Sequence, residues 1–257
     1  MEHSFLISQG LLQIPCRLSE PVGDVRRVVL GVHGFAGSMD DEIQTGLAEE
    51  MPLFGSAVLR FDLPAHGSSP VTDRELNLKA SVQSLLAVAR FARERYPQVE
   101  DLCIFATGFG AYVTLIALEE LLELPGKVKL VVQTPSVRMH ETLLSMLELT
   151  PQSFYLLERM TIPLEPPLTV TYRFYEELLE HIVLTSHPIP MLILHGEADD
   201  YIKMSDIQQF RRINEQSKLV IIPGTSHRFL EEGAWDMVLD LTRDWFEFEQ
   251  VLLTDWI

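Results

Sequence analysis

The sequence predicts an α/β protein with a mostly parallel, doubly wound β-sheet. Two observations carry this prediction: short apolar runs rich in β-branched residues recur along the 257 residues, and helical patterns lie between them. Runs that do not alternate between apolar and polar residues are typical of strands buried on both faces of a parallel sheet. Strands and helices that alternate in this way indicate a doubly wound sheet, whose ligands gather at the carboxyl ends of the strands.

The first predicted element is an antiparallel hairpin, formed by residues 5–7 and 11–15 around a glycine-containing turn and added to an edge of the sheet. The predicted buried strands are residues 28–32, 57–61, 102–106, 128–133, 191–195 and 219–222. Within residues 76–95, apolar side chains follow the i, i+3, i+4, i+7 spacing of one helical face, beginning at Val82. Similar patterns predict helices in residues 112–124 and 207–213.

The alternation of strands and helices breaks between residues 136 and 187. Two helical stretches, residues 141–147 and 173–182, flank a proline-bearing run at 163–167. An insertion of this length is usually functional or disordered, and its apolar content argues against disorder. We therefore expect a single α/β domain over residues 1–257, with residues 136–187 inserted as a cap over the active face.

Composition and charge exclude several classes of partner. With 47% hydrophobic and 22% charged residues, the chain has the composition of a soluble globular protein. Its formal charge of −17 would repel nucleic acid. No apolar run approaches the ~18 residues of a membrane span, and the N-terminus lacks the basic flank and cleavage site of a signal peptide. We expect a cytoplasmic protein that contacts no membrane.

The cysteines and histidines indicate no metal site. Cys16 and Cys103 lie far apart without CxxC spacing, so neither a disulfide framework nor a zinc site is indicated, and both are expected to be buried thiols. The histidine spacing matches no metal-binding pattern. We expect no metal and no cofactor, and the sequence leaves the oligomeric state open.

Five loop motifs follow predicted strands: HGFAGS, DLPAHGSS, ATGFGA, HGEADDYI and PGTSHRF. Together, and in this order, they resemble the α/β-hydrolase family, particularly its small bacterial esterases of the feruloyl/cinnamoyl type. The resemblance covers nearly the whole chain. It implies the α/β-hydrolase fold with an inserted cap, and hydrolysis of a small carboxylic ester with a short or aromatic acyl group.

The resemblance also implies roles for individual residues. His227 matches the base of the catalytic triad, and Asp199 matches its acid, with the neighbouring Asp200 as the rival candidate. The backbone N–H groups of Phe35 and Phe109 match the two donors of the oxyanion hole. Histidines in the other loop motifs match positions where the family uses the imidazole for structural hydrogen bonds.

The nucleophile is missing. Aligning ATGFGA with the elbow pattern G-x-S-x-G places Gly108 where the family has serine. A covalent acyl-enzyme needs an oxygen or sulfur there, whereas glycine adopts the positive φ of an elbow with little penalty. Other hydroxyl or thiol groups lie nearby but lack the elbow geometry, with Ser226 the least implausible; they are Ser38, Ser68, Ser69, Thr107, Cys103 and Ser226.

Three hypotheses follow from this missing side chain. The protein is a slow ester hydrolase in which Asp199 and His227 activate a water, or an impaired hydrolase that only binds an acyl or aromatic ligand under its cap, or a serine esterase in which glycine was introduced at residue 108. Aromatic and apolar residues of the inserted segment could line the ligand pocket or pack the segment's own core. These candidates are Phe154, Tyr155, Met160, Tyr172, Phe174 and Tyr175.

Overall fold

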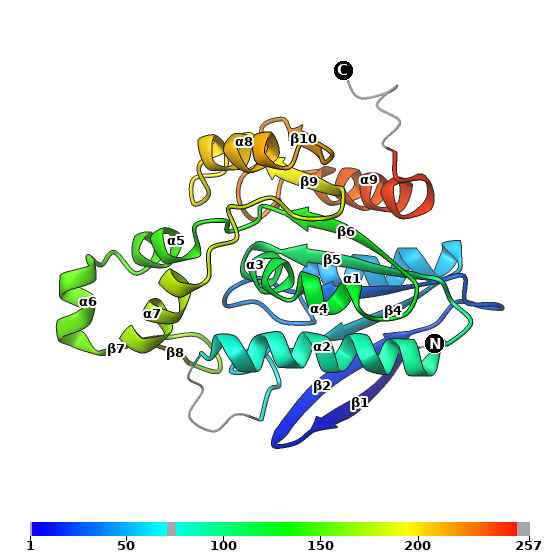
Figure 1. Cartoon of the computed structure of the whole chain (residues 1–257), viewed down its shortest axis with the longest axis horizontal. Coiled ribbons are helices and arrows are strands. Elements are labelled where there is room, and N and C mark those ends of the chain that lie inside the picture. The colour runs from blue at the N-terminus through cyan, green and yellow to red at the C-terminus, as the bar shows by residue number, and fades with distance from the viewer. Residues whose placement is uncertain (1, 71–75, 251–257) are drawn as a thin grey trace.

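A computed structural model describes residues 2–70 and 76–250 of the chain. Its centre is a single sheet of eight strands in the order β1-β2-β4-β3-β5-β6-β9-β10 (Figure 1). The strands are β1 (Glu2–Gln9), β2 (Leu12–Ser19), β3 (Arg27–Val32), β4 (Ser56–Phe61), β5 (Asp101–Thr107), β6 (Lys127–Gln133), β9 (Met191–Gly196) and β10 (Lys218–Ile222). The six predicted strands are all present with nearly the expected bounds, but β10 is not buried as predicted: it is the last strand of the sheet, and only Ile222 of its residues is buried.

The sheet is parallel except at one edge. β1 pairs antiparallel with β2, and β2 antiparallel with β4, whereas β4, β3, β5, β6, β9 and β10 run parallel. Every residue of β3, β4 and β9 is buried, as expected for strands covered on both faces. The predicted α/β class and N-terminal hairpin are confirmed. The hairpin is longer than predicted, because most of β1 lies exposed and carries no apolar pattern to mark its ends.

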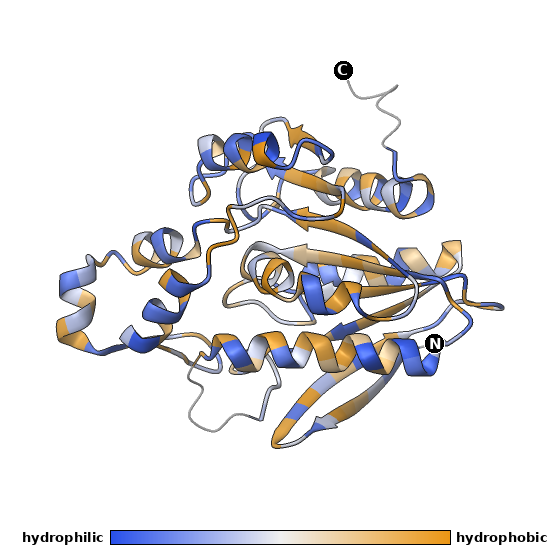
Figure 2. Ribbon diagram, viewed as in Figure 1, coloured by the Kyte–Doolittle hydropathy of each residue, from blue (hydrophilic) through white to orange (hydrophobic). Residues whose placement is uncertain are grey.

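Helices cover both faces of the sheet. α1 (Glu42–Glu50) and α9 (Ala234–Phe248) pack on one face, and α2 (Leu78–Arg95), α3 (Gly108–Ile116), α4 (Leu118–Leu122) and α8 (Met204–Ile213) pack on the other. A short 3₁₀ helix, η1 (Met51–Phe54), follows α1. Hydropathy colouring shows the resulting layers, with apolar residues concentrated in the central strands (Figure 2).

The prediction of one helix over residues 112–124 is wrong in its bounds. The helix begins four residues earlier, at Gly108, and a break at Ala117 separates α3 from α4. Two glycines in the first turn conceal the start of α3, because glycine is a poor helix former. The sequence reading also missed α1 and α9, which form the helical layer on the second face of the sheet.

Residues 136–187 follow β6 and contain more regular structure than predicted. They form α5 (Met139–Met146), α6 (Pro151–Leu157), β7 (Arg159–Ile162), β8 (Leu168–Thr171) and α7 (Tyr172–Glu180), and they lie to one side of the sheet (Figure 1). The helical stretches at 141–147 and 173–182 correspond to α5 and α7. The prediction missed α6, which begins with a capping box between Thr150 and Ser153, and the antiparallel pair β7 and β8. We call residues 136–187 the inserted segment.

Both cysteines are free, buried thiols, as predicted. Burial raises the pKa of Cys16 and of Cys103 to about 12, so neither sulfur is activated. Within residues 2–70 and 76–250, no helix has the length and apolar character needed to cross a membrane.

Candidate active site

The ATGFGA motif forms a sharp turn from strand to helix. β5 ends at Thr107, Gly108 has a φ of +50°, and α3 begins at once. Gly110, two residues further along the chain, lies so close to the end of β3 that a Cβ would collide with the carbonyl oxygens of Val32 and His33. Gly108 adopts its positive φ with little strain, whereas Gly110 is needed for the close packing of α3 on β3.

No side chain fills the space above Gly108. A Cβ built on this residue would have Ser136 Oγ at 3.9 Å and Gly34 Cα at 4.0 Å as its nearest neighbours. These are ordinary van der Waals distances or longer. The site therefore has room for a nucleophile side chain that the sequence does not provide.

Asp199 and His227 come from two neighbouring loops that follow β9 and β10. A Cβ on Gly196, the last residue of β9, would collide with the carbonyl oxygen of Thr225, so these loops pack closely because residue 196 is glycine. Their contact brings Nδ1 of His227 within 2.9 Å of Oδ2 of Asp199. Asp200, the rival candidate, is exposed.

Asp199 is held as a carboxylate. Its side chain is 0% exposed, and burial raises its pKa, but hydrogen bonds from His227 and from the N–H groups of Tyr201 and Ile202 outweigh burial and lower the pKa below its ordinary value. The two N–H groups donate to Oδ1 at 2.9 and 2.8 Å. Because an ionised carboxylate only accepts, His227 donates through Nδ1, and its Nε2 is left as a potential proton acceptor.

The predicted oxyanion donors lie on two adjacent segments. Phe35 occupies the turn after β3, and Phe109 is the second residue of α3; their rings meet edge to face, with centroids 6.4 Å apart. Within the described parts of the chain, neither backbone N–H donates to an acceptor. Both donors are thus available to a ligand oxygen.

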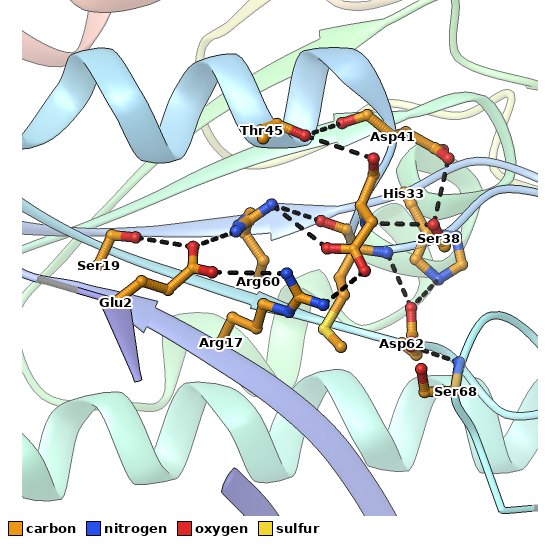
Figure 3. A network of polar contacts seen from close by, with 12 residues as sticks. Glu2, Arg17, Ser19, His33, Ser38, Asp41, Thr45, Arg60, Asp62 and Ser68 are labelled. Carbon is orange, nitrogen blue, oxygen red and sulfur yellow. Dashed lines mark hydrogen bonds and ion pairs between the residues drawn. The ribbon is translucent and has the colours of Figure 1, made fainter. Parts of the chain in front are cut away.

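A polar network fixes the loop that carries Phe35 (Figure 3). The backbone of Met39 is held from both sides: its carbonyl accepts from Arg60 Nη1 at 2.7 Å, and its N–H donates to Asp62 Oδ1 at 2.8 Å. At the start of the loop, His33 Nε2 accepts the N–H of Leu63 at 3.0 Å. The loop is therefore clamped to the carboxyl end of β4.

Arg60 is a buried residue that holds this loop in place and that the sequence reading missed. Its side chain is buried, and it is paired with the carboxylate of Glu2 from β1 and with Asp40 at 3.8 Å. The sequence signal for it is a single charged residue inside the apolar run AVLRF. A buried arginine requires hydrogen-bonding or charged partners, so this charge indicates a polar network next to the strand.

Several of the alternative nucleophiles are buried or hydrogen-bonded to other groups, whereas Ser68 lies exposed. The Thr107 hydroxyl donates to Gln133 at 3.2 Å, and the backbone N–H of Ser226 donates to Glu231 Oε1 at 3.1 Å. Cys103 lies fully buried inside β5. Ser38 donates to Asp41 at 3.3 Å.

The predicted pocket residues of the inserted segment divide into two groups. Phe154, Phe174 and Tyr175 are buried and pack among aromatic neighbours, which favours the alternative that they form the segment's own core. Tyr155 is 63% exposed, so its predicted place in a pocket lining is not supported. Met160 and Tyr172 are half-buried against the same core.

A cleft of about 340 Å³ lies between the loop that carries Phe35 and the inserted segment. It is lined by Ala36 and Gly37, which directly follow Phe35, by residues 65–68 after β4, and by residues 164–166 and 168 of the inserted segment. Gly108 and His227 do not line this cleft, so it is a neighbouring volume rather than the reacting centre.

Comparison with solved structures identifies the fold. Est1E from Butyrivibrio proteoclasticus, in a structure with ferulic acid bound, superposes with a TM-score of 0.82 at 20% identity, covering 96% of this chain and 98% of that chain. Alpha/beta hydrolase domain-containing protein 10 from mouse gives a TM-score of 0.76 at 17% identity, covering 96% of this chain and 100% of that chain. A soluble variant of monoglyceride lipase from Saccharomyces cerevisiae gives a TM-score of 0.74 at 14% identity, covering 95% of this chain and 94% of that chain.

No protein-family model matches the chain, and no curated protein sequence matches it. The structural similarity nevertheless extends over nearly the whole length of each compared chain. It agrees with the mostly parallel sheet, the antiparallel N-terminal strands and the elbow between β5 and α3. The chain therefore has the α/β-hydrolase fold.

Proposed function

We propose that the protein hydrolyses small carboxylic esters by direct attack of water. The observation that carries this proposal is the hydrogen-bonded pair of Asp199 and His227 in a site whose nucleophile position, Gly108, has no side chain. A buried carboxylate that orients an imidazole is the arrangement of a general base. The base is present, and a water takes the place of the serine hydroxyl.

The proposed reaction needs no covalent enzyme intermediate. The water oxygen attacks the acyl carbon while His227 Nε2 takes one of its protons, and the carbonyl electron pair moves onto the oxygen. The N–H groups of Phe35 and Phe109 stabilise this oxyanion, and losing one such donor typically costs about 2.7–4 kcal/mol of barrier stabilisation. When the intermediate collapses, the ester C–O bond breaks and the leaving alkoxide takes the proton from His227. The products are a carboxylic acid and an alcohol.

The expected rate is low compared with a serine esterase. Enzymes that have lost a member of their triad retain roughly 10³–10⁴-fold catalysis over water, from oxyanion stabilisation and binding. We further propose that the inserted segment acts as the cap, and that the cleft beside Phe35 receives part of the substrate. Est1E binds ferulic acid and shares this fold, which makes aromatic acyl esters the first substrates to test.

A second candidate function is binding without turnover. It is favoured by the absence of a side chain at Gly108, together with the hydrogen bond from the Thr107 hydroxyl to Gln133. In that case an acyl or aromatic ligand would occupy the site without being consumed and would raise the melting temperature.

The test compares hydrolysis of p-nitrophenyl acetate and methyl ferulate by the unaltered protein and by His227→Ala. We expect His227→Ala to lower the rate by at least about 10²-fold, because general-base catalysis typically contributes that much. His3→Ala, which alters an exposed histidine on β1, is the matched control and should leave the rate unchanged. Equal rates for the unaltered protein and His227→Ala would refute hydrolysis at this site, and thermal shifts with ferulate would then test the binding function.

A further inference from the structure

Ser136 is the side chain nearest to the missing nucleophile. It is the first residue of the inserted segment, three residues beyond the end of β6, and it is only 4% exposed. Its N–H donates to the carbonyl of Gly108 at 3.3 Å, and its Oγ lies 3.9 Å from the place of a Cβ on Gly108. Backbone and side chain of Ser136 therefore both face the elbow.

The hydroxyl of Ser136 is available for a ligand. No group within residues 2–70 and 76–250 forms a hydrogen bond with its Oγ. Although the residue as a whole is only 4% exposed, its Oγ is not fully enclosed, so a water or a ligand oxygen can reach it and satisfy it. The Ser136 hydroxyl is therefore free to pair with an oxygen from outside the chain.

The position suits an oxygen at the place of the absent serine hydroxyl. That hydroxyl would lie one C–O bond beyond the Cβ of residue 108, so an oxygen on the side facing Ser136 is within hydrogen-bond reach of its Oγ. Ser136 is poorly placed to be the nucleophile itself, because no hydrogen bond joins it to His227 and it is not carried by the elbow. A misplacement of about 1 Å can cost about 10² in rate.

We propose that Ser136 is a positioning residue that holds the attacking water at the nucleophile position. This inference rests on the proposed hydrolysis. One hydrogen of the water points to His227 Nε2 and passes to it on attack, while the other donates to Ser136 Oγ and stays on the oxygen that joins the acyl carbon. Ser136 is unchanged by the reaction, and its role is to aim a lone pair of the water at the carbonyl.

The kinetic test introduces Ser136→Ala in two backgrounds. In the unaltered chain we expect kcat for p-nitrophenyl acetate to fall about tenfold with KM little changed, which is the size of one lost hydrogen bond. In Gly108→Ser, where the nucleophilic oxygen is attached covalently, the same change should alter kcat less than about twofold. Equal losses in both backgrounds, or no loss in either, would overturn the proposal.

A structural test separates this inference from the proposed function. A high-resolution crystal structure of the unliganded protein should show an ordered water bonded to Ser136 Oγ and His227 Nε2, and Ser136→Ala should lack it. If that water depends on Ser136 but the protein hydrolyses no faster than His227→Ala, the proposed function fails and the water site stands. If no water lies there, or if it persists in Ser136→Ala, the inference fails even where hydrolysis is observed.

Discussion

At the scale of single residues, the glycine at residue 108 affects both the backbone strain of the elbow and the presence of a side chain at the predicted nucleophile position. Its φ of +50° lies in the left-handed region, where a residue with a Cβ costs of order 1–3 kcal/mol. A serine elbow retains that strain at its nucleophile. Glycine removes the strain and the hydroxyl together, while leaving the backbone N–H of Phe109 in place.

We expect Gly108→Ser to raise esterase activity by several orders of magnitude. Nothing lies closer than 3.9 Å to the added Cβ, so the serine fits, and losing the nucleophile from an intact triad costs about 10⁶ in kcat. The same change should lower the free energy of unfolding by about 1–3 kcal/mol through backbone strain. Hydrolysis of p-nitrophenyl acetate and chemical denaturation measure the two effects.

Gly108→Ala is the matched control for that experiment. It introduces the same strain without a hydroxyl, so it should be destabilised to a similar extent and gain no activity. A folded Gly108→Ser protein that is no more active than Gly108→Ala would mean that Asp199, His227 and the oxyanion donors are not competent for acyl transfer.

At the scale of elements, α3 and α7 join the elbow to the inserted segment. From α3, the hydroxyl of Tyr112 donates to the carbonyl of His181 at 2.7 Å and contacts that of Leu178 at 3.3 Å. Burial raises the pKa of Tyr112, so it remains a donor. From α7, the ring of Phe174 packs on that of Phe109, with centroids 5.9 Å apart. The helix that starts at Gly108 thus also anchors the end of the inserted segment.

Tyr112→Phe should lower the local stability of α7 without creating a cavity in the core. The ring is preserved, but the carbonyls at the end of α7 lose their donor, which should cost about 1–2 kcal/mol of stability. Hydrogen exchange in residues 172–181 should be faster in Tyr112→Phe than in the unaltered protein, while exchange in the central strands should stay the same. Tyr155→Phe, which alters an exposed tyrosine of the same segment, is the control. Unchanged exchange in α7 would show that this hydrogen bond does not hold the helix.

At the scale of the whole molecule, stability is coupled to pH through buried histidines. Burial lowers the pKa of His33 to about 4, and its Nε2 accepts the N–H of Leu63, so the folded protein requires the neutral ring. An unfolded chain binds a proton on this ring below about pH 6.5. Between about pH 6.5 and 4 the unfolded state therefore holds more protons, and the free energy of unfolding falls as the pH falls.

His33 alone should contribute up to about 1.4 kcal/mol per pH unit across that range. Denaturant unfolding at several pH values from 7.5 to 4.5 measures how steeply the free energy of unfolding depends on pH. His33→Gln, whose side-chain oxygen can accept the N–H of Leu63 without titrating, should give a flatter dependence. The comparison cancels contributions from titratable groups that are distant from His33. Parallel curves for the two proteins would contradict the assignment to His33.

The sequence predicts the elements whose signal is local. The six parallel strands are rich in apolar residues along their length, and this local pattern predicts them without knowledge of their neighbours. The elements that were missed depend on their surroundings: α6 begins through a capping box, and β7 and β8 stabilise each other by pairing. The helix at Gly108 begins with glycines because of the elbow, against its local propensity.

The sequence by itself determined the α/β-hydrolase fold, since the ordered loop motifs need no coordinates, and the glycine at residue 108 is the basis for the prediction that the nucleophile is missing. Only the tertiary structure decided that Asp199, and not Asp200, contacts His227, that Arg60 and Asp62 clamp the loop of Phe35, and that Ser136 faces Gly108. The physical reason is that parallel strands bring loops distant in sequence to one edge, where close packing at glycines such as Gly196 sets which atoms meet.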